Sequence, residues 1–244
     1  MRVDVGFRAE GGVIVGSWPG IGSYRSDREP SFVMDPGGDE RRARKLRAGA
    51  LRALDRRRAG VGLNFHGAAV AVGGDGVVLL GDSGAGKSTH AAALCARCEA
   101  ALLADDIVFV DERDGRFVIV PSEEDHWLDG PSRRLAFAEG SADDAKVPIR
   151  ARSVGREVPV TKIIVLERGA TSDEPVLLRG AAALVPLSSS VIRLPIELET
   201  NERLVRDLDA MSALAKQAAI LRWTPWYDVE GGGLSAFTSS VARG

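Results

Sequence analysis

The amino-acid sequence predicts an α/β fold built around a phosphate-binding loop, and three observations carry that prediction. The segment Gly81–Ser88 fits the pattern G-x-x-x-x-G-K-[ST]. An apolar run, 77–80, precedes this segment, and an alanine- and leucine-rich stretch, 89–100, follows it. Further short apolar runs downstream, including 160–166, are typical of buried strands. A strand, a loop and a helix in succession form the setting in which this motif binds phosphate.

The residue types of this loop suit the phosphate chain of a nucleotide. Glycines let backbone N–H groups turn toward an anion, and the start of a helix adds partial positive charge. Lys87 can reach the β- and γ-phosphates, and the Ser88 hydroxyl can hold Mg²⁺. We therefore expect ATP and Mg²⁺ as ligands; a glycine-rich turn with no ligand is the alternative. The expected nucleotide-binding residues are Gly81, Asp82, Ser83, Gly84, Ala85, Gly86, Lys87, Ser88 and Thr89.

Length and composition narrow the class of protein. The chain has 244 residues and a formal net charge of −2, so no overall positive charge favours nucleic acid or an anionic membrane. No apolar stretch approaches the roughly 20 residues that span a bilayer, and the N-terminus lacks the apolar core of a secretory signal. We expect a soluble cytoplasmic protein. The two cysteines, Cys95 and Cys98, share one face of the predicted helix, as buried structural thiols or as a redox or metal pair.

Two regions are predicted along the chain, 1–60 and 61–244. The first begins with an alternating hairpin around Gly11-Gly12, continues through a loop at 20–38, and ends in a basic helix over about 38–58. The arginines of this helix form a solvated face or a docking surface for an acidic peptide or protein. A role of residues 1–60 in substrate recognition is one expectation.

The second region contains the nucleotide core. Its predicted elements are a hairpin at 68–72 and 77–80, a short strand at 101–104, a hairpin at 107–110 and 117–120, strands at 160–166 and 176–178, and helical periodicity over 196–221.

Asp105 and Asp106 follow the strand predicted at 101–104. Carboxylates at strand ends beside a phosphate-binding loop can hold Mg²⁺ or orient an attacking hydroxyl. Adjacent strand residues point to opposite faces, so the two side chains are expected to serve different roles. A structural aspartate pair in a turn is the alternative. His66 opens the hairpin that leads into the loop, and spacing alone favours a structural role for it.

The order His66-Gly67, a hairpin, Gly81–Ser88 and then Ala104-Asp105-Asp106 resembles the kinase domain of the HPr kinase/phosphorylase family. That family shares its core with phosphoenolpyruvate carboxykinases. The resemblance covers roughly residues 61–125, with weaker likeness to about 230. It implies an α/β P-loop core with a mixed β-sheet, to which this chain adds a small N-terminal β/helical segment. It also implies a tendency to form homo-oligomers. Some compact relatives phosphorylate the precursor peptides of natural products on serine.

The resemblance implies roles for individual residues. Asp105 matches the family's general base, Asp106 a carboxylate on the metal and phosphate side, and His66 the histidine beside the reacting phosphate. The implied metal ligands are Ser88 and Asp106, and the implied catalytic residues are Asp105, His66, Lys87 and Asp106.

The chain also departs from the family pattern. The family's Glu-Ile-Arg-Gly-Leu-Gly signature is not found in this chain. The segment 121–128 takes the place of that signature, and Glu123 or Glu124 could replace the family's metal-binding glutamate. We therefore do not expect phosphorylase activity. Arg133-Arg134 is interpreted as an exposed loop pair or as a grip for an acidic substrate or phosphate.

Three functions compete on these grounds. The leading hypothesis is an ATP- and Mg-dependent kinase that phosphorylates a serine of a protein or peptide, with a natural-product precursor peptide as one candidate substrate. The second is a kinase of small hydroxyl-bearing molecules, which a small closed pocket would favour. The third is a non-catalytic, nucleotide-dependent regulator, which the presence of Asp105, Asp106 and His66 disfavours.

Overall fold

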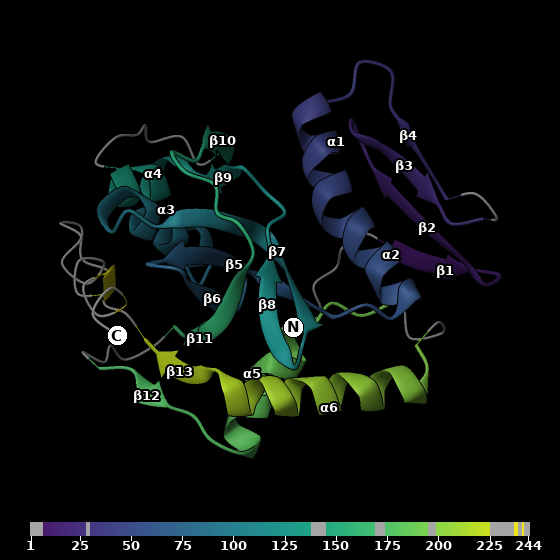
Figure 1. Ribbon diagram of the computed structural model, residues 1–244. Coiled ribbons are helices and arrows are strands. Elements are labelled where there is room, and N and C mark those ends of the chain that lie inside the picture. The colour runs from purple at the N-terminus through teal and green to yellow at the C-terminus, as the bar shows by residue number, and fades with distance from the viewer. Residues whose placement is uncertain are drawn as a thin grey trace.

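The structure is a computed structural model that describes residues 7–27, 30–137, 145–168, 174–194, 199–224, 237–238 and 241. Figure 1 shows a smaller N-terminal unit beside a larger body built on a seven-stranded sheet. Among the described residues, no helix is both long and apolar enough to cross a membrane.

The N-terminal unit contains a four-stranded antiparallel sheet in the order β1-β2-β3-β4. The predicted hairpin is confirmed, because β1 and β2 pair across a turn in which Gly11 and Gly12 have φ of +56° and +82°. The loop predicted over 20–38 is wrong in part, since it contains two strands whose alternate residues include the buried Tyr24. The strands are β1 (Phe7–Glu10), β2 (Val13–Trp18), β3 (Gly22–Arg25) and β4 (Ser31–Met34).

The basic helix is confirmed and has two buried faces. It runs through α1 (Glu40–Leu46), a π-helical segment (Arg47–Leu51) and α2 (Arg52–Ala59). Backbone N–H groups of its first turn donate to the Asp39 side chain, and Gly60 ends it with φ of +68°. Leu51 and Leu54 pack on the N-terminal sheet, whereas Ala53 packs on the larger body. The helix therefore lies between the two units, as Figure 1 shows.

The larger body contains a mixed sheet in the order β12-β13-β11-β6-β5-β7-β8. Strand β11 is parallel to both β6 and β13, and the pairs β5–β6, β5–β7, β7–β8 and β12–β13 are antiparallel. A short pairing of β8 with β11 curls the sheet on itself. The strands are β5 (Leu63–Val72), β6 (Asp75–Gly81), β7 (Ala101–Arg113), β8 (Arg116–Val120), β11 (Val158–Leu166), β12 (Val176–Leu177) and β13 (Ala219–Trp223). The predicted α/β class with a mixed sheet is confirmed.

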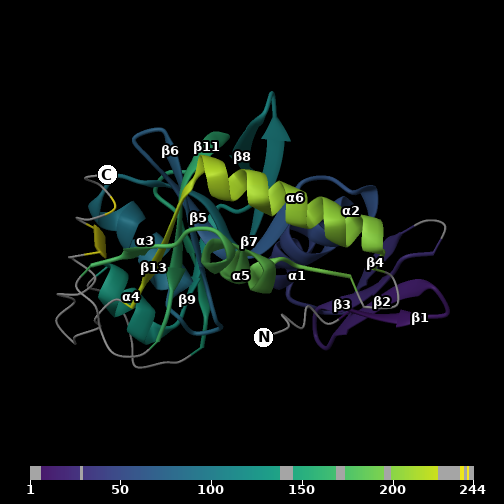
Figure 2. The same ribbon diagram turned by 90° about the horizontal axis from the view of Figure 1, so that it is seen from below.

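Helices cover both faces of this sheet. Apolar residues of α3 (Lys87–Arg97) pack on one face with Val77 and Leu79. Residues of α5 (Ala181–Ser190) and α6 (Asn201–Gln217) pack on the other face with Val78 and Leu80. Alternate residues of β6 therefore contribute apolar side chains to the cores on the two faces of the sheet. Figure 2 shows α6 and α3 on opposite sides of the sheet. A small pair of strands, β9 (Asp125–Leu128) and β10 (Val147–Arg150), lies with α4 (Gly130–Phe137) beside α3.

Several local predictions need correction. One strand, β7, runs straight through Asp105 and Asp106, because the long strand β5 pairs with it on both sides of them. Arg133 and Arg134 lie on α4 rather than in a loop. The helix predicted from the periodicity over 196–221 is too long at its C-terminal end. Helix α6 ends at Gln217, and the apolar run that follows forms β13.

Candidate active site

The phosphate-binding loop connects β6 to α3 with the geometry that the motif predicts. Gly84 and Gly86 have φ of +75° and +88°, values that favour glycine, and Gly86 directly precedes the first turn of α3. The first N–H groups of α3 therefore face the concave side of the loop. The loop opens onto a cavity of about 620 Å³, whose lining includes His66 and Asp82.

Lys87 lies in the loop with its ammonium group bound to the loop's own backbone. Its Nζ donates to the carbonyl oxygens of Gly81 and Asp82, both at 2.9 Å. Burial lowers the pKa of Lys87, and the nearby Asp106 carboxylate opposes that shift. Lys87 is thus held at the mouth of the loop, where a phosphate group could replace these carbonyl partners.

His90 supports the loop from below. It is fully buried, its Nδ1–H donates to the carbonyl of Gly86 at 2.8 Å, and its ring packs edge-on against Phe237. Burial lowers the pKa of His90 to about 4, so the ring is neutral at physiological pH. Thr89, expected among the nucleotide-binding residues, shares a hydrogen bond of 2.9 Å with the hydroxyl of Ser132 on α4.

Three polar side chains from distant segments meet above the loop. Asp106 lies 3.5 Å from Nδ1 of His66 and, through its other oxygen, 3.5 Å from Nζ of Lys45. Lys45 comes from α1 and also lies 4.9 Å from the ring centroid of Trp127, a cation–π distance. Burial and the charge of Lys87 lower the pKa of His66, which favours its neutral form. Sequence reasoning missed Lys45, because it was one of many cations on a helix distant in sequence.

Asp106 has an unusual backbone. Its φ of +137° lies where side chains other than glycine are rarely found. Such conformations are costly and gather at functional sites. Gly67 of β5 pairs with Asp106 of β7, and a Cβ atom at Gly67 would lie 2.7 Å from the carbonyl oxygen of Leu79. The Asp106 side chain is 46 % exposed.

Asp105 points to the opposite face, as strand alternation predicts. It is only 1 % exposed, and Oδ2 accepts a hydrogen bond from the backbone N–H of Trp127 at 2.7 Å. Its own backbone N–H donates to Oε2 of Glu123 at 3.1 Å. The two aspartates therefore have separate surroundings. The accessible carboxylate is Asp106, not Asp105, to which the resemblance assigns the general base.

The two glutamates considered for the metal site also differ. Glu123 is buried, and burial raises its pKa well above the usual value. The charge of Lys45 opposes this shift, and the charges of Asp105 and Asp106 add to it. Glu124 is exposed and forms an ion pair with Arg150. Only Glu123 lies beside the aspartates.

The residues present fit a magnesium ion whose other ligands are phosphate oxygens and waters. Ser88 and Asp106 supply hard oxygen donors, which Mg²⁺ prefers, and Mg²⁺ commonly keeps waters and substrate phosphates among its ligands. Among the residues that the structure describes, no group of three histidine, cysteine, aspartate or glutamate side chains is arranged to hold a metal ion.

Arg168 is a second residue that sequence reasoning missed. It lies two residues after the end of β11, and its guanidinium group donates to the carbonyl of Gly84 in the loop. Arg168 and Arg222 line the cavity beside the loop together with Ser189 and Ser190 of α5. The position of Arg168 after a strand could have indicated that it lies near the loop. Strand β11 is parallel to β6, and the carboxyl ends of parallel strands meet at one edge of a sheet.

The cysteines support a structural interpretation. Both are free and partly buried on or just after α3. Burial raises the pKa of Cys95 to about 12, which disfavours the reactive thiolate.

A comparison with protein-family models supports the resemblance seen in the sequence. Residues 61–127 match the family model described as the HPr serine kinase C-terminal domain. A search of curated proteins finds no match. Among solved structures, the chain is similar to the HPr(Ser) kinase/phosphatase from Coxiella burnetii at 16 % identity, over 59 % of this chain and 86 % of that chain, with a TM-score of 0.35. The matched segment contains β5, β6, the loop, α3 and both aspartates. Residues 61–127 are therefore similar to the HPr serine kinase C-terminal domain.

Proposed function

We propose that this protein is an ATP- and Mg-dependent kinase that phosphorylates a serine of a protein or peptide. The observation that carries the proposal is the group formed by Asp106, His66 and Lys45 above a phosphate-binding loop that holds Lys87. Phosphoryl transfer depends mainly on positioning and on neutralising charge, and this arrangement provides cations, loop N–H groups and one accessible carboxylate.

In the proposed reaction, the serine hydroxyl oxygen forms a bond to the γ-phosphorus while the bond from that phosphorus to the β–γ bridging oxygen breaks. The products are phosphoserine and ADP, and the hydroxyl proton passes to Asp106. Neutral His66 donates an N–H to an oxygen of the transferred group, and Lys45 holds the Asp106 carboxylate in place. Bound at Ser88 and the phosphates, Mg²⁺ would supply charge neutralisation.

This proposal moves the role of general base from Asp105 to Asp106. A hydroxyl group must come within hydrogen-bond distance of its base, and the exposed Asp106 meets this condition better than the buried Asp105. Asp105 then positions β9 through the N–H of Trp127. The expected role of Asp106 as a metal ligand is the competing assignment.

The test is transfer of label from γ-labelled ATP to a panel of serine-containing peptides and to a cell lysate, using wild-type protein and the variants Asp105→Asn and Asp106→Asn. We expect labelled serine with wild type and a loss of roughly 100-fold or more in Asp106→Asn, with ATP binding retained. If Asp106→Asn binds ATP normally only at raised Mg²⁺, its role is that of a metal ligand. Full transfer by Asp106→Asn together with loss in a folded Asp105→Asn would return the base to Asp105.

A second candidate function is phosphorylation of a small hydroxyl-bearing molecule. The cavity of about 620 Å³ beside the loop is of a size that binds small molecules, and it combines apolar residues such as Leu178 with Arg168 and Arg222. Label recovered in a metabolite rather than in a protein would favour this function. Label only in inorganic phosphate would favour a nucleotide-dependent regulator.

The division into residues 1–60 and 61–244 and a role of the first in substrate recognition stay part of the proposal, as do homo-oligomerisation and a cytoplasmic location. Lys45 connects the first region directly to the site. Sedimentation analysis and cell fractionation test the last two points.

A further inference from the structure

A second cavity lies on the flank of α3 away from the phosphate-binding loop. It has a volume of about 330 Å³ and lies between α3, α4, β9 and the segment that continues β10. Its lining shares no residue with that of the cavity beside the loop. A volume of this size is in the range that holds a small organic molecule.

A buried histidine lines this cavity and has no hydrogen-bond partner. His126 is only 1 % exposed, yet neither Nδ1 nor Nε2 contacts a hydrogen-bonding atom of the described residues. Buried polar groups are nearly always paired, with protein, water or a ligand, because an unpaired one costs free energy. The ring needs an acceptor for one nitrogen and a donor for the other. A ligand in this cavity could provide both.

Three guanidinium groups surround the same cavity. Arg133 comes from α4, Arg150 from the end of β10, and Arg152 from the segment that follows. Arg150 already pairs with Glu124 and lies 3.8 Å from Asp125, so its charge is largely offset. Arg152 adds a further positive charge to the lining. The fork of an arginine matches the oxygens of phosphate and carboxylate groups.

The remaining wall of the cavity is apolar. Phe137 and Ile149 line it, and Cys95 of α3 lines it as well. Burial raises the pKa of this thiol to about 12, so it adds no negative charge. Positive and apolar walls together suit a ligand with a charged end and an apolar body.

We propose that this cavity is a binding site for a small organic anion, in which an oxyanion group bonds to Arg152 and His126 while an apolar body packs against Phe137 and Ile149. The site is separate from the nucleotide loop and does not depend on the proposed kinase activity. Phosphate and carboxylate share this chemistry, and the experiment distinguishes them.

The chain offers a direct readout, because it contains three histidines in three different places. His66 reports on the loop, His90 lies beneath the loop, and His126 reports on the proposed site. Proton–nitrogen correlation spectra of the imidazole groups would be recorded for the full chain during titration with phenyl phosphate, benzoate and phenol. His126→Gln assigns the signals.

We expect phenyl phosphate or benzoate to shift the His126 signals in a saturable way, and phenol to have little effect. The stronger of the two anions identifies the preferred headgroup. Arg152→Met should weaken this binding about tenfold, because a charge-assisted hydrogen bond is lost. Arg156→Met is the matched control, since Arg156 is also exposed but lies outside the cavity, and it should bind as wild type does.

Three results would overturn the proposal. One is a shift confined to His66, which would place the anion in the phosphate-binding loop. Another is an equal response to phenol, which would show an apolar cavity without anion selectivity. The third is equal binding by Arg152→Met and Arg156→Met, which would show nonspecific attraction.

Discussion

The helix that follows the phosphate-binding loop and the basic helix of the N-terminal unit both carry basic side chains with defined partners, but they hold them differently. In α3, Lys87 and His90 bond to backbone carbonyls of the adjacent loop. In the basic helix, Lys45, Arg56 and Arg57 pair with carboxylates from distant parts of the chain. The first arrangement is local in sequence, whereas the second exists only after the units have packed together. The expectation of a mainly solvated basic face therefore fails for these three residues.

The largest expected effect concerns α3, whose basic residues bond to the adjacent loop. Lys87→Ala removes the cation that we expect to contact the β- and γ-phosphates, so ATP affinity should fall by roughly 100-fold or more. Isothermal calorimetry with ATP and Mg²⁺ measures the change. Lys216→Ala, an exposed lysine on α6, is the control. Unchanged ATP affinity in Lys87→Ala would remove the loop from the proposed mechanism.

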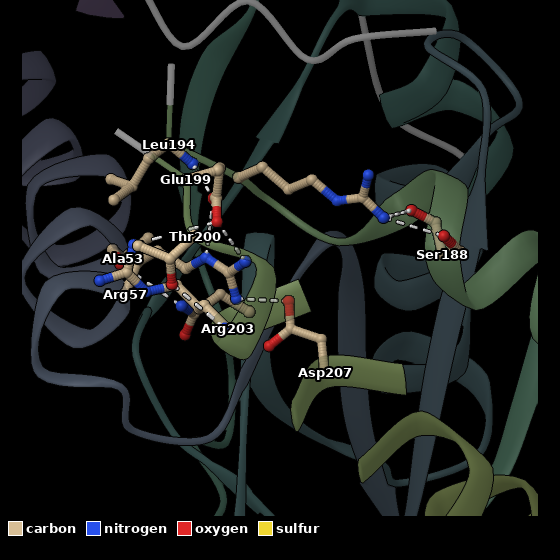
Figure 3. A network of polar contacts seen from close by, with 10 residues as sticks. Ala53, Arg57, Ser188, Leu194, Glu199, Thr200, Arg203 and Asp207 are labelled. Carbon is tan, nitrogen blue, oxygen red and sulfur yellow. Dashed lines mark hydrogen bonds and ion pairs between the residues drawn. The ribbon is translucent and has the colours of Figure 1, made fainter. Parts of the chain in front are cut away.

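The next effect tests the distant pairings. Arg57 is buried and pairs with Glu199 at 2.9 Å and with Asp207, as Figure 3 shows. Arg57→Met leaves both buried carboxylates without this partner, which should lower the free energy of unfolding by about 3–5 kcal/mol. Denaturant unfolding measures it, with the exposed Arg44→Met on the same helix as control. Similar losses in the two variants would contradict a specific structural role for the Arg57 pairs.

Acid should lower the free energy of unfolding through His90, which lies beneath the phosphate-binding loop. The pKa of His90 is lowered to about 4 from about 6.5, so the unfolded chain binds this proton more strongly. The stabilising contribution is complete above about pH 6.5 and is lost as pH falls toward 4, by about 3 kcal/mol. The free energy of unfolding of wild type minus that of His90→Gln should fall by this amount over that range. A difference that stays constant with pH would mean that His90 titrates normally.

The smallest expected effect sharpens the role of the basic helix in the site. Lys45→Met removes the cation beside Asp106, and because the pair is partly exposed, kcat should fall only about fivefold. KM for ATP should not change, and Lys45→Arg should restore most of the rate. Steady-state kinetics measure both quantities, with Arg44→Met as the neighbouring control. A fall confined to affinity for ATP would instead place Lys45 on the nucleotide side.

The same contrast explains what could be predicted from sequence. The loop, its strand and α3 were predicted correctly, because glycine conformation, apolar runs and helix formation act over neighbouring residues. Alternation predicted that Asp105 and Asp106 face opposite sides, but tertiary packing decides which side is accessible. Lys45, Trp127 and Arg168 come from separate segments, and no local pattern brings them together. Strands β3 and β4 were missed because they are short and lie among glycines, serines and charged residues.

The contiguous run from β5 through β7 also has a consequence for folding kinetics. These strands and α3 pair mostly with their neighbours in sequence, and they carry His66, the loop, Asp105 and Asp106. Strand β13 instead joins β11 across α5 and α6, and the basic helix must dock from the other unit. Contacts close in sequence form faster than distant ones. We therefore expect the phosphate-binding half of the site to be formed early, before Lys45 reaches Asp106.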